Sequence, residues 1–283
     1  MTIVLRSLVV RSGSTTLVNG VALRLAPASR TALVGASGAG KSLTCAALAG
    51  TLPASLEVTG SLTVEPDDVD PDNAPRASFA VGGEAGGVNL LGLPAARRPR
   101  DSRIALVAQD HSTALHPLIA VGRQIFLASQ AAGRTLGEAD QCATDYLYAV
   151  GLDESLADRV PSRLSGGQRQ RISLALALAA EPALMIADEP TTALDVVARA
   201  EILRLLTSLT NLPEAPALLL ITHDLPAAAI CENVVVLHGG AVMERGPAAQ
   251  VLAHPEHPVT VAMCEAAAEE TIDGALAAAG AAA

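Results

Sequence analysis

The sequence of 283 residues predicts an α/β fold whose main sheet is open and largely parallel. Residues 103–110, 183–190 and 217–224 are short apolar runs that end in polar residues, as is typical of central parallel strands covered on both faces. Residues 30–35 form another such run, which leads into a glycine-rich loop and an expected helix that begins near Lys41. Because ligands of such sheets bind beyond the carboxyl ends of the strands, we expect the functional site there.

The N-terminal residues predict an antiparallel unit. Residues 3–10 and 17–25 are rich in Val and Leu, partly alternate with polar residues, and are joined by a turn at residues 11–16. Residues 66–88 are rich in Pro, Asp, Gly and Ala, so we expect a surface insertion without a core of its own.

The second half of the chain predicts helices and a further hairpin. Residues 122–150 and 168–180 have helical patterning, and residues 233–246 predict a hairpin around a Gly-Gly pair. The tail from about residue 265 is acidic and then alanine-rich, which fits either a short frayed helix or a disordered segment.

Composition argues against several classes of function. The net charge is −10 and no basic patch stands out, so we expect no nucleic-acid partner. The arginine run at 97, 98 and 100 fits a solvated loop. The longest apolar runs, such as residues 174–180, fall far short of the ~20 residues that a membrane helix needs, and the N-terminus has no signal-peptide pattern. We therefore expect a soluble protein whose membrane role, if any, comes from a partner.

The cysteines do not predict a metal site. Their wide separation matches neither zinc nor iron–sulfur spacing, and free buried thiols in a reducing compartment fit best. The four residues are Cys45, Cys142, Cys231 and Cys264.

A phosphate-binding loop is the strongest motif. It matches GxxxxGK[ST] and consists of Gly35, Ala36, Ser37, Gly38, Ala39, Gly40, Lys41 and Ser42. The glycines let successive N–H groups face one centre, and the following helix adds its positive end. We expect Lys41, the only lysine of the chain, to reach the β- and γ-phosphates of a nucleotide and the Ser42 hydroxyl to bind Mg²⁺.

Two carboxylates follow the apolar run at 183–190. Asp188 would stand at the sheet edge, where it can hold Mg²⁺ directly or through water. Glu189 is placed to orient or deprotonate a water that attacks the γ-phosphate. An ordinary pair of strand-end carboxylates is the alternative, which the preceding phosphate loop disfavours.

The pentapeptide LSGGQ at residues 164–168 precedes an expected helix. Its Ser-Gly-Gly turn offers a second group of N–H donors for phosphate, or else a plain helix start with Ser165 as the N-cap. The residues concerned are Ser165, Gly166, Gly167 and Gln168.

This pentapeptide, placed between the phosphate loop and the Asp-Glu strand, resembles the signature motif of ATP-binding-cassette (ABC) ATPases. Gln109 follows a strand, as in the family's glutamine loop. The stretch from Thr192 to Asp195 resembles the loop that crosses between subunits, and His223 ends the last apolar strand, as the switch histidine does.

The resemblance implies a P-loop NTPase (RecA-like) core with an antiparallel β subdomain and an inserted α-helical signature subdomain. We expect the ATPase domain to span residues 1–264, with the helical subdomain at about 111–180 and the flexible insertion at about 66–88. Residues 265–283 would form a separate tail.

The resemblance also implies the cofactors ATP and Mg²⁺ and a reaction in which two cassettes face head to tail. ATP on the loop of one would be closed over by the signature residues 165–168 of the other, with Asp195 in the crossing loop. Glu189 would act as the base, His223 would contact the γ-phosphate, and Gln109 would sense Mg²⁺ and the attacking water. Ser42, Asp188 and Gln109 would be the metal-site residues.

Two stretches, 108–125 and 243–263, are similar to peptide and nickel importer ATPases. Residues 40–47 and 187–203 look nearest to the nickel-importer subunit, and the choice between nickel and peptide stays open. The implied partners are integral-membrane permease subunits, a second and different cassette, and indirectly a solute-binding protein. The implied place is the cytoplasmic face of the membrane.

Two alternatives are a soluble cassette ATPase of the translation-factor or DNA-repair type and a non-hydrolytic nucleotide-binding partner. The chain departs from the family's usual pattern: no aromatic residue precedes Phe79 to stack on adenine, the insertion at 66–88 is longer than expected, and the cysteine cluster of some peptide-importer ATPases has no counterpart. Arg11 or Ser12 stands near the expected place of the aromatic residue.

Overall fold

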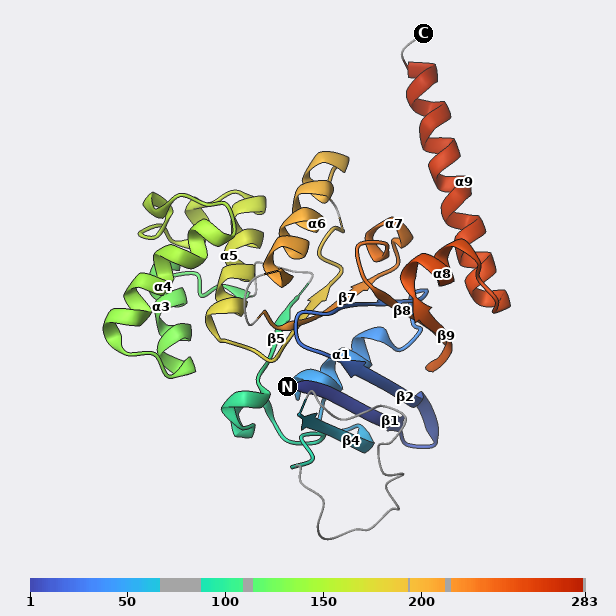
Figure 1. Ribbon diagram of the computed structural model, residues 1–283, viewed down its shortest axis with the longest axis horizontal. Helices are drawn as coiled ribbons and strands as arrows, with labels where there is room; N and C mark the ends of the chain where they lie inside the picture. The colour runs from blue at the N-terminus through green and yellow to red at the C-terminus, as the bar shows by residue number, and fades with distance from the viewer. Residues whose placement is uncertain (67–87, 109–113, 193, 212–214, 282–283) are drawn as a thin grey trace.

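The computed structural model describes the chain apart from residues 67–87, 109–113, 193, 212–214 and 282–283, and it describes side chains of the last helix up to residue 269. It contains two sheets, with helices packed on and around them (Figure 1). Most of the insertion expected at 66–88 lies outside the described residues.

The larger sheet has six strands in the order β5-β6-β7-β3-β8-β9. The first five are parallel and β9 pairs with β8 antiparallel, which confirms the predicted open sheet and the C-terminal hairpin. The strands are β3 (Arg30–Val34), β5 (Ile104–Val107), β6 (Leu184–Asp188), β7 (Ala217–Thr222), β8 (Asn233–His238) and β9 (Ala241–Pro247).

The central strand β7 is buried along its whole length because apolar layers cover both faces of the sheet. Leu218 and Leu220 point into one core, and Leu219 and Ile221 point into the other. This alternation explains why β7 has an uninterrupted apolar sequence instead of alternating polar and apolar residues.

The smaller sheet is antiparallel in the order β2-β1-β4. Its first two strands confirm the predicted N-terminal hairpin. The third was not predicted, and its sequence contains Gly60, a residue that weakens a strand pattern. The β1–β4 pairing has a bulge, because it shifts between Arg6 and Val9, where Ser7 has a φ of 49°. The strands are β1 (Thr2–Ser12), β2 (Thr15–Leu25) and β4 (Glu57–Glu65).

The described helices form distinct groups. Helices α3, α4 and α5 make a unit beside the sheets, and α6 stands between this unit and α7 in Figure 1. The helices are α1 (Lys41–Ala49), α3 (Val121–Ala132), α4 (Leu136–Ala149), α5 (Gly166–Ala179), α6 (Val196–Thr210), α7 (Leu225–Ala228), α8 (Ala248–Ala253) and α9 (Pro258–Ala281). Among the described elements, no helix is both long enough and apolar enough to cross a bilayer.

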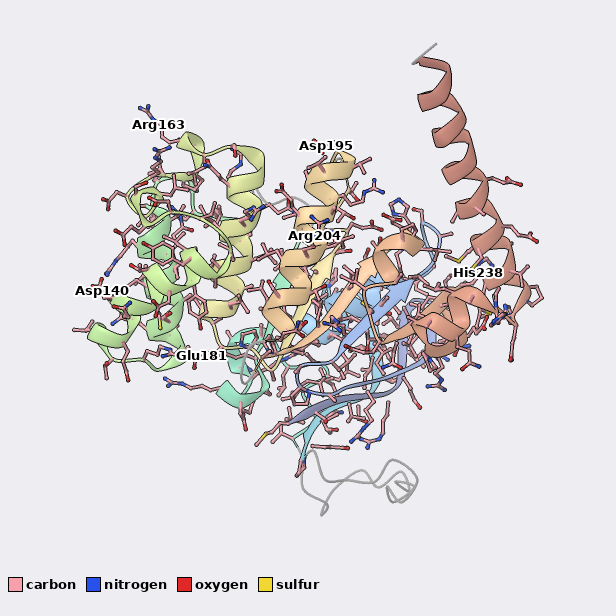
Figure 2. All side chains as sticks on the ribbon, turned by 45° about the horizontal axis from the view of Figure 1, so that its top comes forward. Asp140, Arg163, Glu181, Asp195, Arg204 and His238 are labelled. Carbon is pink, nitrogen blue, oxygen red and sulfur yellow. The ribbon has the colours of Figure 1, made fainter. Side chains whose placement is uncertain are left out.

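The C-terminal segment up to Ala281 is helical. Helix α9 begins before residue 265 and runs without interruption across the expected domain boundary, and its far end extends away from the rest of the molecule (Figures 1 and 2). Of the two sequence alternatives the helix is therefore correct, although it is longer than expected.

One arginine of the expected solvated loop is buried. Arg97 and Arg100 are exposed, but Arg98 keeps only 9% of its surface in contact with solvent. Its guanidinium donates hydrogen bonds to the carbonyls of Leu48 and Ala47 in the last turn of α1 and lowers the cost of burying them. The prediction was wrong for this residue. The cysteines are free as expected, with Cys264 only half-buried.

Candidate functional site

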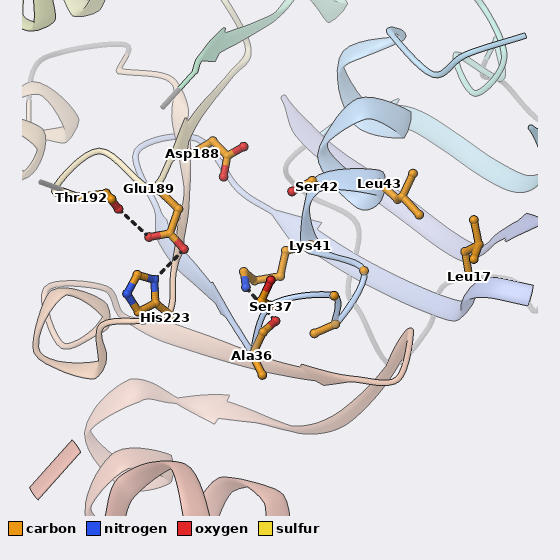
Figure 3. Close-up of a pocket in the computed structure, with 13 residues that line it drawn as sticks. Leu17, Ala36, Ser37, Lys41, Ser42, Leu43, Asp188, Glu189, Thr192 and His223 are labelled. Carbon is orange, nitrogen blue, oxygen red and sulfur yellow. Dashed lines mark hydrogen bonds and ion pairs between the residues drawn. The ribbon is translucent and has the colours of Figure 1, made fainter. Parts of the chain in front are cut away.

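A cavity of about 690 Å³ opens at the carboxyl ends of β3, β6 and β7 (Figure 3). The sequence placed the site at this edge. The residues that line the cavity are Leu17, Ala36, Ser37, Gly38, Ala39, Gly40, Lys41, Ser42, Leu43, Asp188, Glu189, Thr192 and His223.

The phosphate-binding loop connects the end of β3 to the first residue of α1. Gly40 has a φ of 102°, and a Cβ on Gly35 would lie 2.4 Å from the carbonyl oxygen of Leu237. Both positions therefore require glycine. Without a side chain at Gly35, the loop can approach β8 closely. The loop leads into the positive N-terminal end of α1, which has no acidic residue in its first turn.

Lys41 lies inside the loop. Its side chain is 9% exposed, and Nζ donates hydrogen bonds to the carbonyl oxygens of Gly35 at 2.6 Å and Ala36 at 3.1 Å. The ammonium group is thus enclosed by the same backbone that offers N–H donors to a phosphate. A compact cation suits this position better than a planar guanidinium.

Asp188 and Glu189 stand where β6 ends, next to the loop. Burial raises the pKa of the Asp188 carboxyl, the charge of Glu189 raises it further, and Lys41 opposes both effects. Glu189 has a φ of 49°, the left-handed region that a residue other than glycine rarely adopts. Its N–H donates to the carbonyl of Ile221 at 2.9 Å, which holds this backbone against β7. Such local strain is common at functional sites.

Glu189 is the centre of a small hydrogen-bonded group. His223, which follows β7, places Nδ1 2.9 Å from Oε1 of Glu189, and the Thr192 hydroxyl donates to Oε2 at 3.1 Å (Figure 3). The Glu189 side chain is 14% exposed and the His223 side chain is 65% exposed. The carboxylate is therefore mostly enclosed, while the imidazole is free to turn towards a ligand.

The LSGGQ residues do not line the cavity. Ser165 caps α5 in a capping box: its hydroxyl accepts from the N–H of Gln168 at 3.2 Å, and its own N–H donates to the Gln168 side chain at 3.0 Å. A Cβ on Gly166 or Gly167 would meet no atom within 4 Å. This helix start is exposed, so within one chain the residues match the plain N-cap alternative.

Asp195 likewise lies outside the cavity. Its side chain caps α6 by accepting from the N–H of Ala198 at 2.9 Å. Arg163 directly precedes the LSGGQ residues. In Figure 2 it lies on the same side of the molecule as Asp195. Gln109 falls outside the described residues, so its prediction has no structural counterpart.

The opposite end of the cavity is aliphatic. Leu17 of β2 and Leu43 of α1 lie there, across the loop from Glu189 (Figure 3). Neither Arg11 nor Ser12 lines the cavity. Leu17 was missed because nothing in the local sequence marks it. Its position depends on the C-terminal hairpin, where the Asn19 N–H donates to the carbonyl of Gly240 at 2.7 Å.

A phosphate-binding loop after a parallel strand, with an acidic pair and a histidine at the adjoining strand ends, defines a P-loop nucleotide-binding protein. The chain belongs to the ABC transporter family: the family model described as "ABC transporter" matches residues 18–192. This membership confirms the resemblance drawn from the LSGGQ region, and the chain is accordingly an ATP-binding protein with the ABC ATPase fold.

Two curated relatives cover most of the chain. Oligopeptide transport ATP-binding protein OppD of Haemophilus influenzae is 36% identical over 260 residues, which are 90% of this chain and 74% of the relative. Probable D,D-dipeptide transport ATP-binding protein DdpD of Escherichia coli K12 is 34% identical over 269 residues, or 92% and 75% of the two chains.

Two solved structures have the same fold. A dimeric post-hydrolysis state of the ATP-binding cassette MJ0796, bound to ADP and Pi, has a TM-score of 0.64 and 25% identity, and the match covers 87% of this chain and 98% of that one. CbiO1 from Clostridium perfringens, part of the ABC transporter complex cbiONQ, has a TM-score of 0.68 and 24% identity over 89% and 90% of the chains.

Proposed function

We propose that this ABC ATPase energises an importer of peptides. The observation that carries the proposal is the similarity, over about nine tenths of the chain, to two relatives that are named as oligopeptide and dipeptide transport ATP-binding proteins. Nickel was the other candidate and stays the alternative cargo. The relatives' names favour transport over the soluble alternative, and the Glu189–His223 pair favours hydrolysis over mere nucleotide binding.

The cavity supports one orientation of ATP. The loop N–H groups and Lys41 would hold the β- and γ-phosphates, with the γ-phosphate towards Glu189 and His223. The ribose and base would then lie at the Leu17 end. A base can rest on an aliphatic side chain there, which would replace the missing aromatic contact.

Mg²⁺ fits this site. Asp188 is a half-buried carboxylate next to a second one, and a cation would offset the charge that burial and Glu189 make unfavourable. The Ser42 hydroxyl lines the same cavity, and Mg²⁺ commonly takes one or two protein oxygens together with nucleotide phosphates. When bound, Mg²⁺ neutralises charge on the phosphates. We keep Gln109 as a further expected contact of the metal and water.

Glu189 is the proposed general base. A water oxygen attacks the γ-phosphorus, the bond to the ADP oxygen breaks, and the water proton passes to the carboxylate. His223 can turn from Glu189 to the γ-phosphate because its ring is largely exposed.

The exposed helix starts support a second cassette. Residues 165–168 and Asp195 lie outside their own cavity, and we propose that they close over ATP bound to a partner cassette. The MJ0796 structure is a dimer. A partner of different sequence, membrane permease subunits and a solute-binding protein remain our expectation, as does a position at the cytoplasmic face of the membrane. We also keep residues 1–264 as one ATPase domain, with the helical subdomain at about 111–180.

The test is reconstitution of the chain with candidate permease subunits and their binding protein in liposomes. We expect ATP-dependent uptake of a labelled tripeptide, and loss of uptake and hydrolysis in the Glu189→Gln variant with ATP binding retained. Uptake of ⁶³Ni²⁺ instead of the tripeptide would replace peptide by nickel. Failure to bind any permease would favour the soluble alternative.

A further inference from the structure

Thr192 contacts the proposed base through two separate hydrogen bonds. Its N–H donates to the carbonyl oxygen of Glu189 at 3.2 Å, which closes a turn, and its hydroxyl donates to Oε2 of the Glu189 carboxylate at 3.1 Å. The turn fixes the separation of the two residues. The hydroxyl thus bonds one carboxylate oxygen of Glu189, and His223 pairs with the other.

The Thr192 hydroxyl and the His223 ring together restrain the Glu189 side chain, because each contacts a different carboxylate oxygen. Contacts to both oxygens fix the rotation of the carboxylate plane, which is a soft torsion in a free glutamate. Each carboxylate oxygen can accept about two hydrogen bonds, so one position on each stays available to water. The Glu189 carboxylate is therefore held in one orientation and can still accept a hydrogen bond from water.

The His223 contact cannot persist throughout the reaction if this residue also meets the γ-phosphate. The His223 side chain is largely exposed, whereas the Glu189 side chain is mostly enclosed. Once the imidazole turns away, the Thr192 hydroxyl is the remaining side-chain donor to Glu189 among the hydrogen bonds of the described residues.

We propose that Thr192 is a positioning residue, which holds the Glu189 carboxylate in the orientation that faces the attacking water while His223 is engaged elsewhere. This inference rests on the proposed ATPase mechanism. Its chemical requirement is a hydroxyl donor three residues after the base, so serine should serve and valine, which has the same shape without the donor, should not.

The experiment compares Thr192→Val, Thr192→Ser and the matched control Thr59→Val in the full chain. Thr59 is an exposed threonine on β4 that does not line the cavity. We expect Thr192→Val to lower kcat roughly three- to tenfold, the usual effect of one lost hydrogen bond, with KM and the Kd of a fluorescent ATP analogue unchanged. Thr192→Ser should recover most of the lost rate, and Thr59→Val should match the wild type.

A double-mutant cycle with Glu189→Gln separates positioning from other roles. Single-turnover assays with labelled ATP follow the slow residual hydrolysis of the Glu189→Gln background, in which the Thr192→Val loss should disappear. Persistence of the loss there, an unchanged or raised kcat in Thr192→Val, or an equal loss in Thr192→Ser would overturn the inference. Thermal unfolding checks that each variant is folded, and Thr192→Ala replaces Thr192→Val if the latter is not. Absence of ATP hydrolysis by the wild-type chain would instead overturn the proposed function.

Discussion

At the scale of single residues, Lys41 shows that position and shape matter as well as charge. Nζ is enclosed by the carbonyls of Gly35 and Ala36, and the side chain is buried. Lys41→Arg keeps the charge but puts a wider, planar group into this space. We expect ATP hydrolysis to fall about 100-fold, as misplacement by about 1 Å in an active site can cause.

The measurement is steady-state phosphate release, with an exchange of similar chemistry at the exposed Arg97, Arg97→Lys, as the control. Near-normal hydrolysis by Lys41→Arg would mean that charge alone is needed in the loop. The status of Lys41 as the only lysine would then be an accident of composition.

The raised pKa of Asp188 makes the stability of the fold depend on pH. Because burial is the main cause of the shift, the folded protein favours the protonated carboxyl. The contribution of this carboxyl to the free energy of unfolding is therefore complete below its pKa in the unfolded chain, and it is lost as the pH rises through its pKa in the folded protein. At neutral pH without Mg²⁺ the ionised carboxylate therefore destabilises the fold. We expect Asp188→Asn to raise Tm by roughly 2 °C under these conditions and to change it little in acid.

The same variant should lose the extra stabilisation that Mg²⁺-ATP gives over ATP alone. Asp140→Asn, at an exposed position on α4, is the control for removal of a charge (Figure 2). Calorimetry at pH 7 and pH 5 measures both effects. An Asp188→Asn variant that is less stable at pH 7 and still gains from Mg²⁺ would contradict both the pKa direction and the proposed metal role.

At the scale of secondary-structure elements, the sequence was most informative for strands that are buried on both faces of the sheet. The strands β6 and β7, apolar up to their last residue, could be identified as central strands, and the loop before α1 could be located from its glycines. Strand β4 was not identified, because Gly60 lies inside it and glycine weakens a strand pattern. Lys41, Asp188, Glu189 and His223 were identified from motifs and do meet in one cavity.

Two site residues could not be assigned their roles from the sequence. Leu17 belongs to the cavity because the C-terminal hairpin packs against β2, a tertiary contact that leaves no local pattern in the sequence. Thr192 was expected only as part of the crossing loop, and it belongs to the cavity because a local turn carries its hydroxyl back to Glu189. Conversely, the LSGGQ turn has a clear pattern, and yet within one chain it only caps a helix.

The bulge between β1 and β4 gives a prediction about stability. Gly60 has a φ of 118°, and a Cβ there would lie 2.7 Å from the carbonyl oxygen of Arg6 and 2.8 Å from that of Ser7. We expect Gly60→Ala to lower the free energy of unfolding by about 1 to 3 kcal/mol. Gly137→Ala is the matched control, since Gly137 lies in the first turn of α4 with no atom within 4 Å of its built Cβ.

Urea unfolding monitored by circular dichroism measures both variants. Gly137→Ala should be neutral or slightly stabilising because alanine suits a helix better than glycine. Equal stability of the two alanine variants would show that the β1–β4 bulge can relax at little cost.

At the scale of the whole molecule, the complete ATP site that we propose is divided between surfaces that one chain does not bring together. The cavity holds the phosphate loop and the base, while the starts of α5 and α6 lie elsewhere on the surface. Two matched glycines test this division. Gly167 in α5 and Gly137 in α4 both occupy the second helical position after a capping box, and neither has an atom within 4 Å of a built Cβ.

Aspartate at either position suits a helix start, so neither Gly167→Asp nor Gly137→Asp should harm folding. If α5 covers the ATP of a partner cassette, the new charge in Gly167→Asp repels its phosphates. We therefore expect hydrolysis by the assembled transporter to fall about 100-fold, with the Kd of ATP for the isolated chain unchanged. Gly137→Asp should leave both quantities unchanged. A weaker Kd for the isolated Gly167→Asp chain would place the LSGGQ turn at its own nucleotide, and normal hydrolysis would remove it from the reaction.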